Sequence, residues 1–123
     1  MLDEWVEKAE ADYQAAIALN RRRVRPLPDI VCYHCSQCVE KYLKVFLVSH
    51  GEIPPRIHDL PTLLDLCLLH DGRLAAVLAL VHQLNPYGVL VRYPGFSTDI
   101  HEARDAVDAT RRVRRRIRYR LRL

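Results

Sequence analysis

The stretch "CYHCSQCVEKYLK", residues 32–44, decides how the rest of this sequence is interpreted. Its three cysteines have the Cys-x₂-Cys-x₂-Cys spacing with which a ferredoxin cluster motif begins. The next ligand of that motif and the proline after it would fall at Tyr42 and Leu43. On a helix, Cys32 and Cys38 are separated by about 9 Å of rise and about 120° of rotation, so these thiolates cannot meet at one metal. We therefore expect packing cysteines on a buried helix, with neither a metal site nor a cofactor.

The helix that contains this stretch is expected to run from about Ile30 to His50 and to end at Gly51. It is apolar around most of its circumference, which predicts the most buried helix of the protein. One polar stripe interrupts this pattern and consists of His34, Gln37, Glu40, Lys41 and Lys44. The stripe either lines a phosphate-binding groove together with Arg92, or it is solvated or faces a dimer partner. In the second case Glu40 and Lys44 form an ordinary surface ion pair.

Helical periodicity also precedes this helix, because apolar residues recur every three or four positions between Asp3 and about Arg22. Asp3 is the expected N-cap of that first helix. The prolines of "RRRVRPLPD" end it, and Asp29 is the expected N-cap of the second helix.

Shorter helices are expected in the second half of the chain. Asp59 suits the N-cap of a short helix that stops at Asp71-Gly72, and a fourth helix spans about 73–84. The prolines and glycines of "NPYGVLVRYPGFSTD" forbid a long helix in this segment, although its part "YGVLVRY" can form a short extended piece. The last helix begins near Ser97 or Thr98. The sequence thus predicts an all-α, up-and-down bundle of four or five helices in a single domain spanning residues 1–123.

The net charge of +4 is distributed unevenly along the chain. Residues 1–20 contain five acidic residues against one lysine, whereas residues 104–123 contain nine arginines against two aspartates. The two ends are expected to lie side by side and to neutralise each other in part. The acidic N-terminus lacks the pattern of a signal peptide, and charged residues interrupt the apolar region 60–84. These features predict a cytoplasmic protein with reduced thiols and no membrane partner.

Several pieces of the chain, taken in order, resemble the HEPN domains, a family named for its occurrence in higher eukaryotes and prokaryotes and for nucleotide binding. The resemblance covers nearly the whole chain and rests on "CYHCSQCVEKYLK", "GEIPPRIHDLPTLL", "VRYPGF" and "EARDAV". It implies a homodimeric helical bundle that binds a nucleotide or RNA phosphate. It also implies a minimal nucleotidyltransferase protein as partner, in a toxin–antitoxin-like pair.

Many HEPN proteins are ribonucleases, and the resemblance leaves catalysis open. The nuclease members carry an arginine and a histidine separated by four to six residues near the last helices. In this sequence Arg92 and His101 have eight residues between them, as do Arg73 and His82. The alternative function is a metal-independent endoribonuclease acting in a dimer cleft, in which Arg92 stabilises phosphate charge and His101 or His58 moves the proton. A purely structural partner of another protein is the third possibility.

Arg92 and Tyr93 are the first candidates for a binding site, because a guanidinium beside an aromatic ring can hold phosphate while a base stacks. Alternatively, Arg92 caps a helix or pairs with an acid, and Tyr93 belongs to the core. His58 and Asp59 either form an acid–base pair or have structural roles. In the second case Asp59 is a helix cap and His58 makes a structural hydrogen bond. From the polar stripe, His34, Lys41 and Lys44 complete the set of candidate ligand-binding residues.

The C-terminal "RRVRRRIRYRLRL" has an apolar seam of Val113, Ile117 and Leu121 at the four-residue spacing of one helix face. The seam is expected to pack on the bundle while arginines cover the other directions. Such a surface can bind RNA or DNA phosphates. Alternatively, its arginines pair with the acidic first helix and with acids of a partner.

Overall fold

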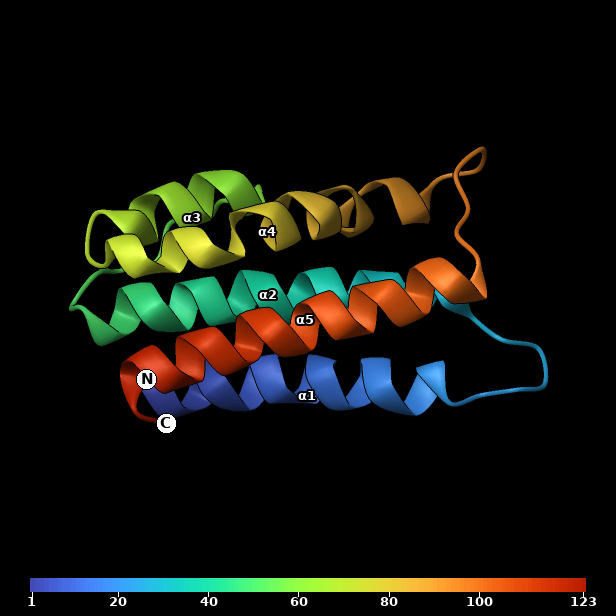
Figure 1. Ribbon diagram of the computed structural model, residues 1–123, viewed down its shortest axis with the longest axis horizontal. Coiled ribbons are helices and arrows are strands. Elements are labelled where there is room, and N and C mark those ends of the chain that lie inside the picture. The colour runs from blue at the N-terminus through green and yellow to red at the C-terminus, as the bar shows by residue number, and fades with distance from the viewer.

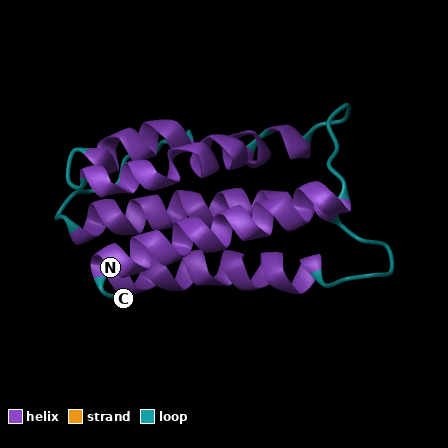
Figure 2. Cartoon of the chain, in the orientation of Figure 1, coloured by secondary structure: helices purple, strands orange, loops and turns teal.

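The computed structural model describes residues 1–123, which form helices joined by turns and loops, with no β-strand (Figures 1 and 2). The predicted all-α helical bundle is confirmed. Three long helices run along the long axis, and two shorter ones cover the side of α2 away from α1 (Figure 1). Their bounds are α1 (Leu2–Asn20), α2 (Pro28–Ser49), α3 (Leu60–Leu68), α4 (Leu78–Leu84) and α5 (Ile100–Leu121).

Helix α2 is the centre of the bundle, because it contacts α1, α3, α4 and α5. Most of its residues are buried, as the sequence predicts. Its three cysteines and Cys67 of α3 are free, and each is 0% exposed. Burial raises the pKa of the Cys32 thiol to about 11 and those of Cys35 and Cys67 to about 12. These cysteines are therefore packing residues, and no group of three or more Cys, His, Asp or Glu side chains is placed to hold a metal.

The two predicted N-caps in the first part of the chain are wrong. Helix α1 begins one residue before Asp3, with Met1 at the N-cap position. Helix α2 begins at Pro28, since proline at the first helical position loses no hydrogen bond. Asp29 consequently lies inside the first turn, where it accepts hydrogen bonds of 2.7 Å from both the backbone N–H and the hydroxyl of Thr98. This contact ties the start of α2 to the segment before α5.

The second half of the chain contains more 3₁₀ structure than the sequence predicts. The first half of the predicted fourth helix is a 3₁₀ helix, η1 (Gly72–Val77), and only its second half is α4. The extended piece suggested for "YGVLVRY" is absent, and two 3₁₀ turns take its place, η2 (Asn85–Gly88) and η3 (Leu90–Arg92). Pro86 is compatible with the start of such a turn, because it has no backbone N–H to satisfy.

Helix α5 begins at Ile100, later than the expected start near Ser97 or Thr98. Asp99 is its N-cap, and the carboxylate accepts hydrogen bonds from the backbone N–H groups of His101 and Glu102. The predicted seam is confirmed, since Val113 and Ile117 are fully buried and Leu121 is half-buried.

The segment Gly72–Arg92 is long and apolar enough to cross a membrane, with a mean hydropathy of 1.5. In the structure it is divided among η1, α4, η2 and η3. Four of its apolar side chains belong to the core of the bundle, namely Leu74, Val77, Val81 and Leu84. Length and composition therefore do not by themselves make this segment a membrane span.

The two oppositely charged ends of the chain lie side by side, as expected, because α1 and α5 are in contact (Figure 1). Glu10 accepts hydrogen bonds from Arg114 at 2.7 and 2.6 Å, and Arg118 lies 4.0 Å away. The Arg114 guanidinium lowers the pKa of the Glu10 carboxyl. No other acidic residue of α1 pairs with an arginine of α5, since Asp12 pairs instead with His34 and Lys41 of α2. The expected neutralisation is thus confined to Glu10.

Candidate functional site

A cavity of about 390 Å³ lies between α2, the loop before α3 and the 3₁₀ turns after α4. It brings Arg92 together with His58 and Asp59, which the sequence also singles out and which lie far from Arg92 along the chain. The other polar side chains of the lining are Gln37, Glu40 and Asn85. This cavity is the candidate functional site, because it collects a guanidinium, an imidazole and carboxylates at one place.

A buried ion pair orients His58. Glu40 and Lys44, one turn apart on α2, are only 6% and 5% exposed, and Lys44 Nζ donates to Glu40 Oε2 at 3.4 Å. The other carboxylate oxygen, Oε1, lies 3.1 Å from His58 Nδ1, whereas the rest of the His58 side chain is largely exposed. The alternative of an ordinary surface pair is therefore wrong for Glu40 and Lys44. The pair is covered on one side by Trp5 of α1, whose ring lies 5.9 Å from Lys44 Nζ, and on the other by His58.

Arg92 is held over the ring of Tyr33, and not beside Tyr93 as the sequence suggests. Its guanidinium carbon lies 5.1 Å from the centroid of the Tyr33 ring, and Nη2 donates a hydrogen bond of 2.7 Å to the Tyr33 hydroxyl. No carboxylate lies within ion-pair distance of Arg92. Its charge is thus free for an anion, while the cation–π contact fixes its position.

Asp59 lies at the rim of the cavity and has a structural role as N-cap of α3, one of the two interpretations that the sequence leaves open. It accepts hydrogen bonds from the hydroxyl of Thr62 at 2.6 Å, from Asn85 Nδ2 at 3.0 Å and from the backbone N–H of Thr62 at 3.1 Å. These bonds lower the pKa of the Asp59 carboxyl. Asn85 Oδ1 accepts in turn from the Leu60 backbone N–H at 2.9 Å. The Asp59–Asn85 contact therefore joins the start of α3 to η2 and fixes the cavity wall.

The other sequence-predicted residues lie outside this cavity. His34 and Lys41 point toward α1, where both pair with Asp12. Tyr93 is 60% exposed and is not part of the cavity lining. His101 is exposed in the first turn of α5 and does not share the cavity with Arg92.

Two contributors to the site escape sequence reasoning. Tyr33 precedes His34 in the stretch 32–44, but it does not belong to the polar stripe. Its contact with Arg92 forms only because η3 folds back onto α2, which the sequence does not indicate. Asn85 reads as an ordinary turn residue before Pro86. The Asn-Pro dipeptide marks a turn, yet it gives no sign that the amide bridges two elements.

The arrangement supports two kinds of chemistry. An unpaired guanidinium fixed on a ring can bind a phosphate group. A histidine whose Nδ1 faces a carboxylate keeps Nε2 available for proton transfer. Both groups line the same cavity.

Comparison with known proteins gives one match. No curated protein and no solved structure matches the chain at a significant level. The family model described as "HEPN domain" matches residues 2–119, which is nearly the whole chain of 123 residues. The helical bundle agrees with that family. The chain therefore belongs to the HEPN domain family, a family of nucleotide- and RNA-related helical modules.

Proposed function

We propose that this HEPN protein binds a nucleotide or an RNA phosphate in the cavity lined by Arg92, His58 and Glu40. The observation that carries the proposal is the state of Arg92, which has no acidic partner and is held over Tyr33 beside the cavity. An arginine fixed in this way loses little conformational freedom when it binds phosphate.

Nucleotide titration followed by NMR chemical shifts tests this proposal. AMP, ATP and a short RNA are added to the wild type, to Arg92→Ala and to Arg73→Ala, which removes an exposed arginine of η1 outside the cavity. We expect saturable shifts around residues 33, 58 and 92 in the wild type and in Arg73→Ala, and their loss in Arg92→Ala. Equal binding by both variants, or no shift up to millimolar ligand, would contradict the proposal.

A second candidate function, a metal-independent endoribonuclease, is favoured by the contact of 3.1 Å between His58 Nδ1 and Glu40 Oε1. In that reaction His58 would accept the proton of the 2′-hydroxyl as its oxygen forms a bond to phosphorus, and Arg92 would stabilise the charge on the phosphate. The bond between phosphorus and the 5′-oxygen would break, the leaving oxygen would take a proton from water, and a 2′,3′-cyclic phosphate would remain. His101 is the less suitable base, because it does not share a cavity with Arg92.

Incubation with labelled RNA in EDTA tests the nuclease. Cleavage that is lost in Arg92→Ala and His58→Ala but retained in His101→Ala would support it. Cleavage lost in His101→Ala, with His58→Ala active, would instead assign the proton transfer to His101. Saturable nucleotide binding without any cleavage would leave the binding module as the function.

The remaining parts of the proposal concern partners. We propose a cytoplasmic homodimer that works with a minimal nucleotidyltransferase protein in a toxin–antitoxin-like pair. The dimer is supported by two apolar side chains that are exposed at the cavity, namely Val89 and Leu90. Sedimentation of the wild type and of Leu90→Glu tests it, and we expect a dimer in the first case and a monomer in the second. Co-purification with the product of a neighbouring nucleotidyltransferase gene tests the partner.

A further inference from the structure

The outward face of α5 carries arginines along most of its length. At about 100° per residue, Arg104, Arg112, Arg115 and Arg116 fall on the side of α5 opposite its buried face. All four are exposed. Asp105 and Asp108 share this face, so the surface is basic on balance but not uniformly so.

Half of the eight arginines of α5 form ion pairs within the chain, and the other half do not. Ion pairs within 4.0 Å involve Arg111 with Asp108, Arg114 and Arg118 with Glu10, and Arg120 with Asp71. None involves Arg104, Arg112, Arg115 or Arg116. The acidic helix α1 therefore does not cancel the charge of the outward face, which is the alternative that the sequence leaves open.

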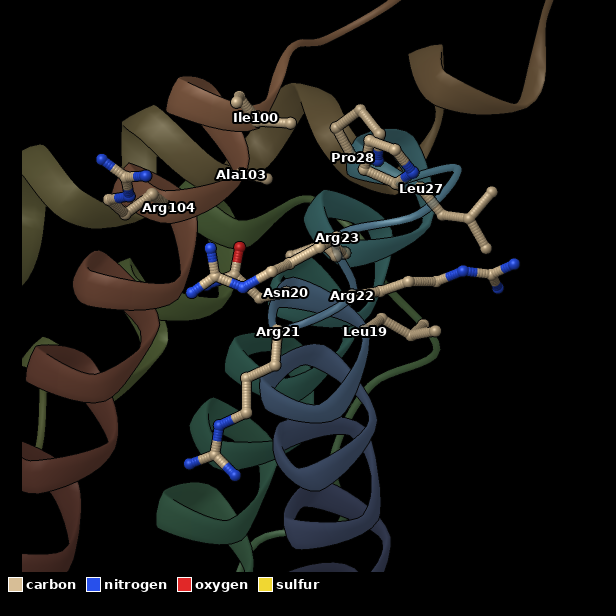
Figure 3. Close-up of a pocket in the computed structure, with 12 residues that line it drawn as sticks. Leu19, Asn20, Arg21, Arg22, Arg23, Leu27, Pro28, Ile100, Ala103 and Arg104 are labelled. Carbon is tan, nitrogen blue, oxygen red and sulfur yellow. The ribbon is translucent and has the colours of Figure 1, made fainter.

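This face continues into a cavity of about 480 Å³ at the end of the bundle where α1 ends and α5 begins. Arg104 belongs to both, since it lies on the outward face of α5 and lines the cavity. Figure 3 shows Arg23 extending from the loop after α1 toward α5, with Arg21 on the same side and Arg22 directed away. Apolar side chains such as Leu19, Val31 and Ala103 complete the lining. The charged groups thus rim a surface that is partly apolar.

An aromatic ring lies at the opposite end of the face. Tyr119 is 72% exposed, and a shallow hollow is lined by this tyrosine together with Arg112, Arg115 and Arg116. An exposed ring among unpaired guanidinium groups is the combination that binds single-stranded nucleic acids, because bases stack on the ring while phosphates contact the arginines.

We propose that these residues form a binding site for single-stranded RNA, here named the basic track and consisting of Arg21, Arg23, Arg104, Arg112, Arg115, Arg116 and Tyr119. Its α5 portion, from 104 to 119, is about 22 Å long. This length is enough for several phosphates of one strand to contact the arginines. The track shares no residue with the cavity of Arg92 and His58, so it does not depend on the proposed function.

Fluorescence anisotropy with a labelled twelve-nucleotide oligouridine tests the track at several salt concentrations. The test variant is Arg112→Glu/Arg115→Glu. The control, Arg56→Glu/Arg73→Glu, changes the net charge equally at exposed arginines outside the track. We expect at least a tenfold loss of affinity in the test variant and a much smaller loss in the control. The slope of log K against log salt should decrease by about 1.4 in the test variant, which is about 0.7 for each lost phosphate contact.

Substitutions of Tyr119 separate the contribution of base stacking to RNA binding from that of charge. Tyr119→Ala should weaken binding, whereas Tyr119→Phe should not, because the ring is retained. An RNA duplex of the same length should bind more weakly than the single strand. A single DNA strand of the same length shows whether the track prefers RNA or binds any single-stranded nucleic acid. If Arg112→Glu/Arg115→Glu does not fold, as judged by circular dichroism, Arg112→Gln/Arg115→Gln replaces it.

The outcomes that overturn the track are specific. Equal losses in the test and control variants would mean that binding follows net charge alone. No binding by the wild type at 50 mM salt would exclude the site. Tighter binding of the duplex, or equal binding by Tyr119→Ala, would exclude the single-stranded mode. The AMP shifts around residues 33, 58 and 92 should be unchanged in Arg112→Glu/Arg115→Glu, so failure of the track and failure of the Arg92 site can be told apart.

Discussion

At the residue scale, the polar atoms inside this protein are few and each has a partner. No buried side-chain nitrogen or oxygen lacks a hydrogen bond. The Glu40–Lys44 pair is the main case, because it places two charges in the core of α2 and presents one carboxylate oxygen to His58. A buried pair contributes little net stability, although breaking it is costly, since the remaining charge is uncompensated. Its position suggests that the pair serves the site more than the fold.

The cost of breaking this pair can be measured. Lys44→Met should lower the free energy of unfolding by about 3 kcal/mol, because it leaves the Glu40 carboxylate buried without its cation. The double variant Lys44→Met/Glu40→Gln should recover much of that loss. Urea denaturation of the two variants and the wild type gives the comparison. Equal destabilisation by the single and double variants would show that lost packing, not the unpaired charge, is responsible.

The four thiols allow a second test at this scale. They are 0% exposed, and burial raises the pKa of Cys32 to about 11 and of Cys35 to about 12. We expect the native protein to react with a disulfide reagent at pH 8 far more slowly than the unfolded protein, because the thiolate is the reactive form. The unfolded protein should react at all four positions. Fast reaction in the native state would contradict the buried packing of α2.

At the element scale, the site is held by short segments and not by the long helices alone. The Asp59–Asn85 hydrogen bond joins the start of α3 to η2, and the stack of Arg92 on Tyr33 joins η3 to α2. Neither η2 nor η3 contains a buried residue. Their geometry therefore depends on individual side-chain contacts.

Removing the α3 cap should weaken this region. We expect Asp59→Ala to lower the free energy of unfolding by about 1 kcal/mol, a typical value for an N-cap. Since the folded-state pKa of Asp59 is lowered, its contribution is present above the unfolded-state pKa and disappears as the pH falls through the folded-state pKa. Thermal unfolding at pH 7 and pH 3 should therefore show a smaller effect at pH 3. Asp65→Ala, an exposed position within α3, is the matched control.

How much the sequence predicts differs between elements. Helical periodicity correctly predicts α1, α2 and α5, because each buries a continuous apolar face. The 3₁₀ turns between α4 and α5 have no such periodicity, so their conformation follows from contacts with α2 that a local pattern does not contain. The site shows the same division. Arg92 and His58 are recognisable from the sequence, whereas the partnership of Tyr33 with Arg92 requires that η3 fold back onto α2.

At the scale of the whole molecule, one ion pair connects the two ends of the sequence. Glu10 and Arg114 are separated by more than a hundred residues and join α1 to α5 through two hydrogen bonds. Tyr42 of α2 donates to the same carboxylate at 2.5 Å. Three long helices therefore meet at one carboxyl group.

The pH dependence of stability should reflect this junction. The folded-state pKa of Glu10 lies below its ordinary value of 4.5, so its contribution is fully present above pH 4.5 and is lost as the pH falls through the folded-state pKa. Glu10→Gln should be less stable than the wild type at pH 7, with the difference shrinking toward pH 3. Chemical denaturation across this range measures it, and Glu7→Gln, an exposed α1 residue without an ion-pair partner, should show no such trend. If Glu10→Gln were still less stable than the wild type at pH 3, the loss of stability would come from altered packing of the side chain and not from its lost charge.

The central position of α2 has a kinetic consequence. Its backbone amides are shielded by neighbours on several sides, so they should exchange hydrogen with the solvent only when the whole protein opens. The η3 segment contains no buried residue, so it can detach in far smaller fluctuations. The wall of the cavity that α2 forms should therefore stay folded when the wall formed by η2 and η3 opens. A bound phosphate would be released by this local opening, which is far more frequent than unfolding of the whole bundle.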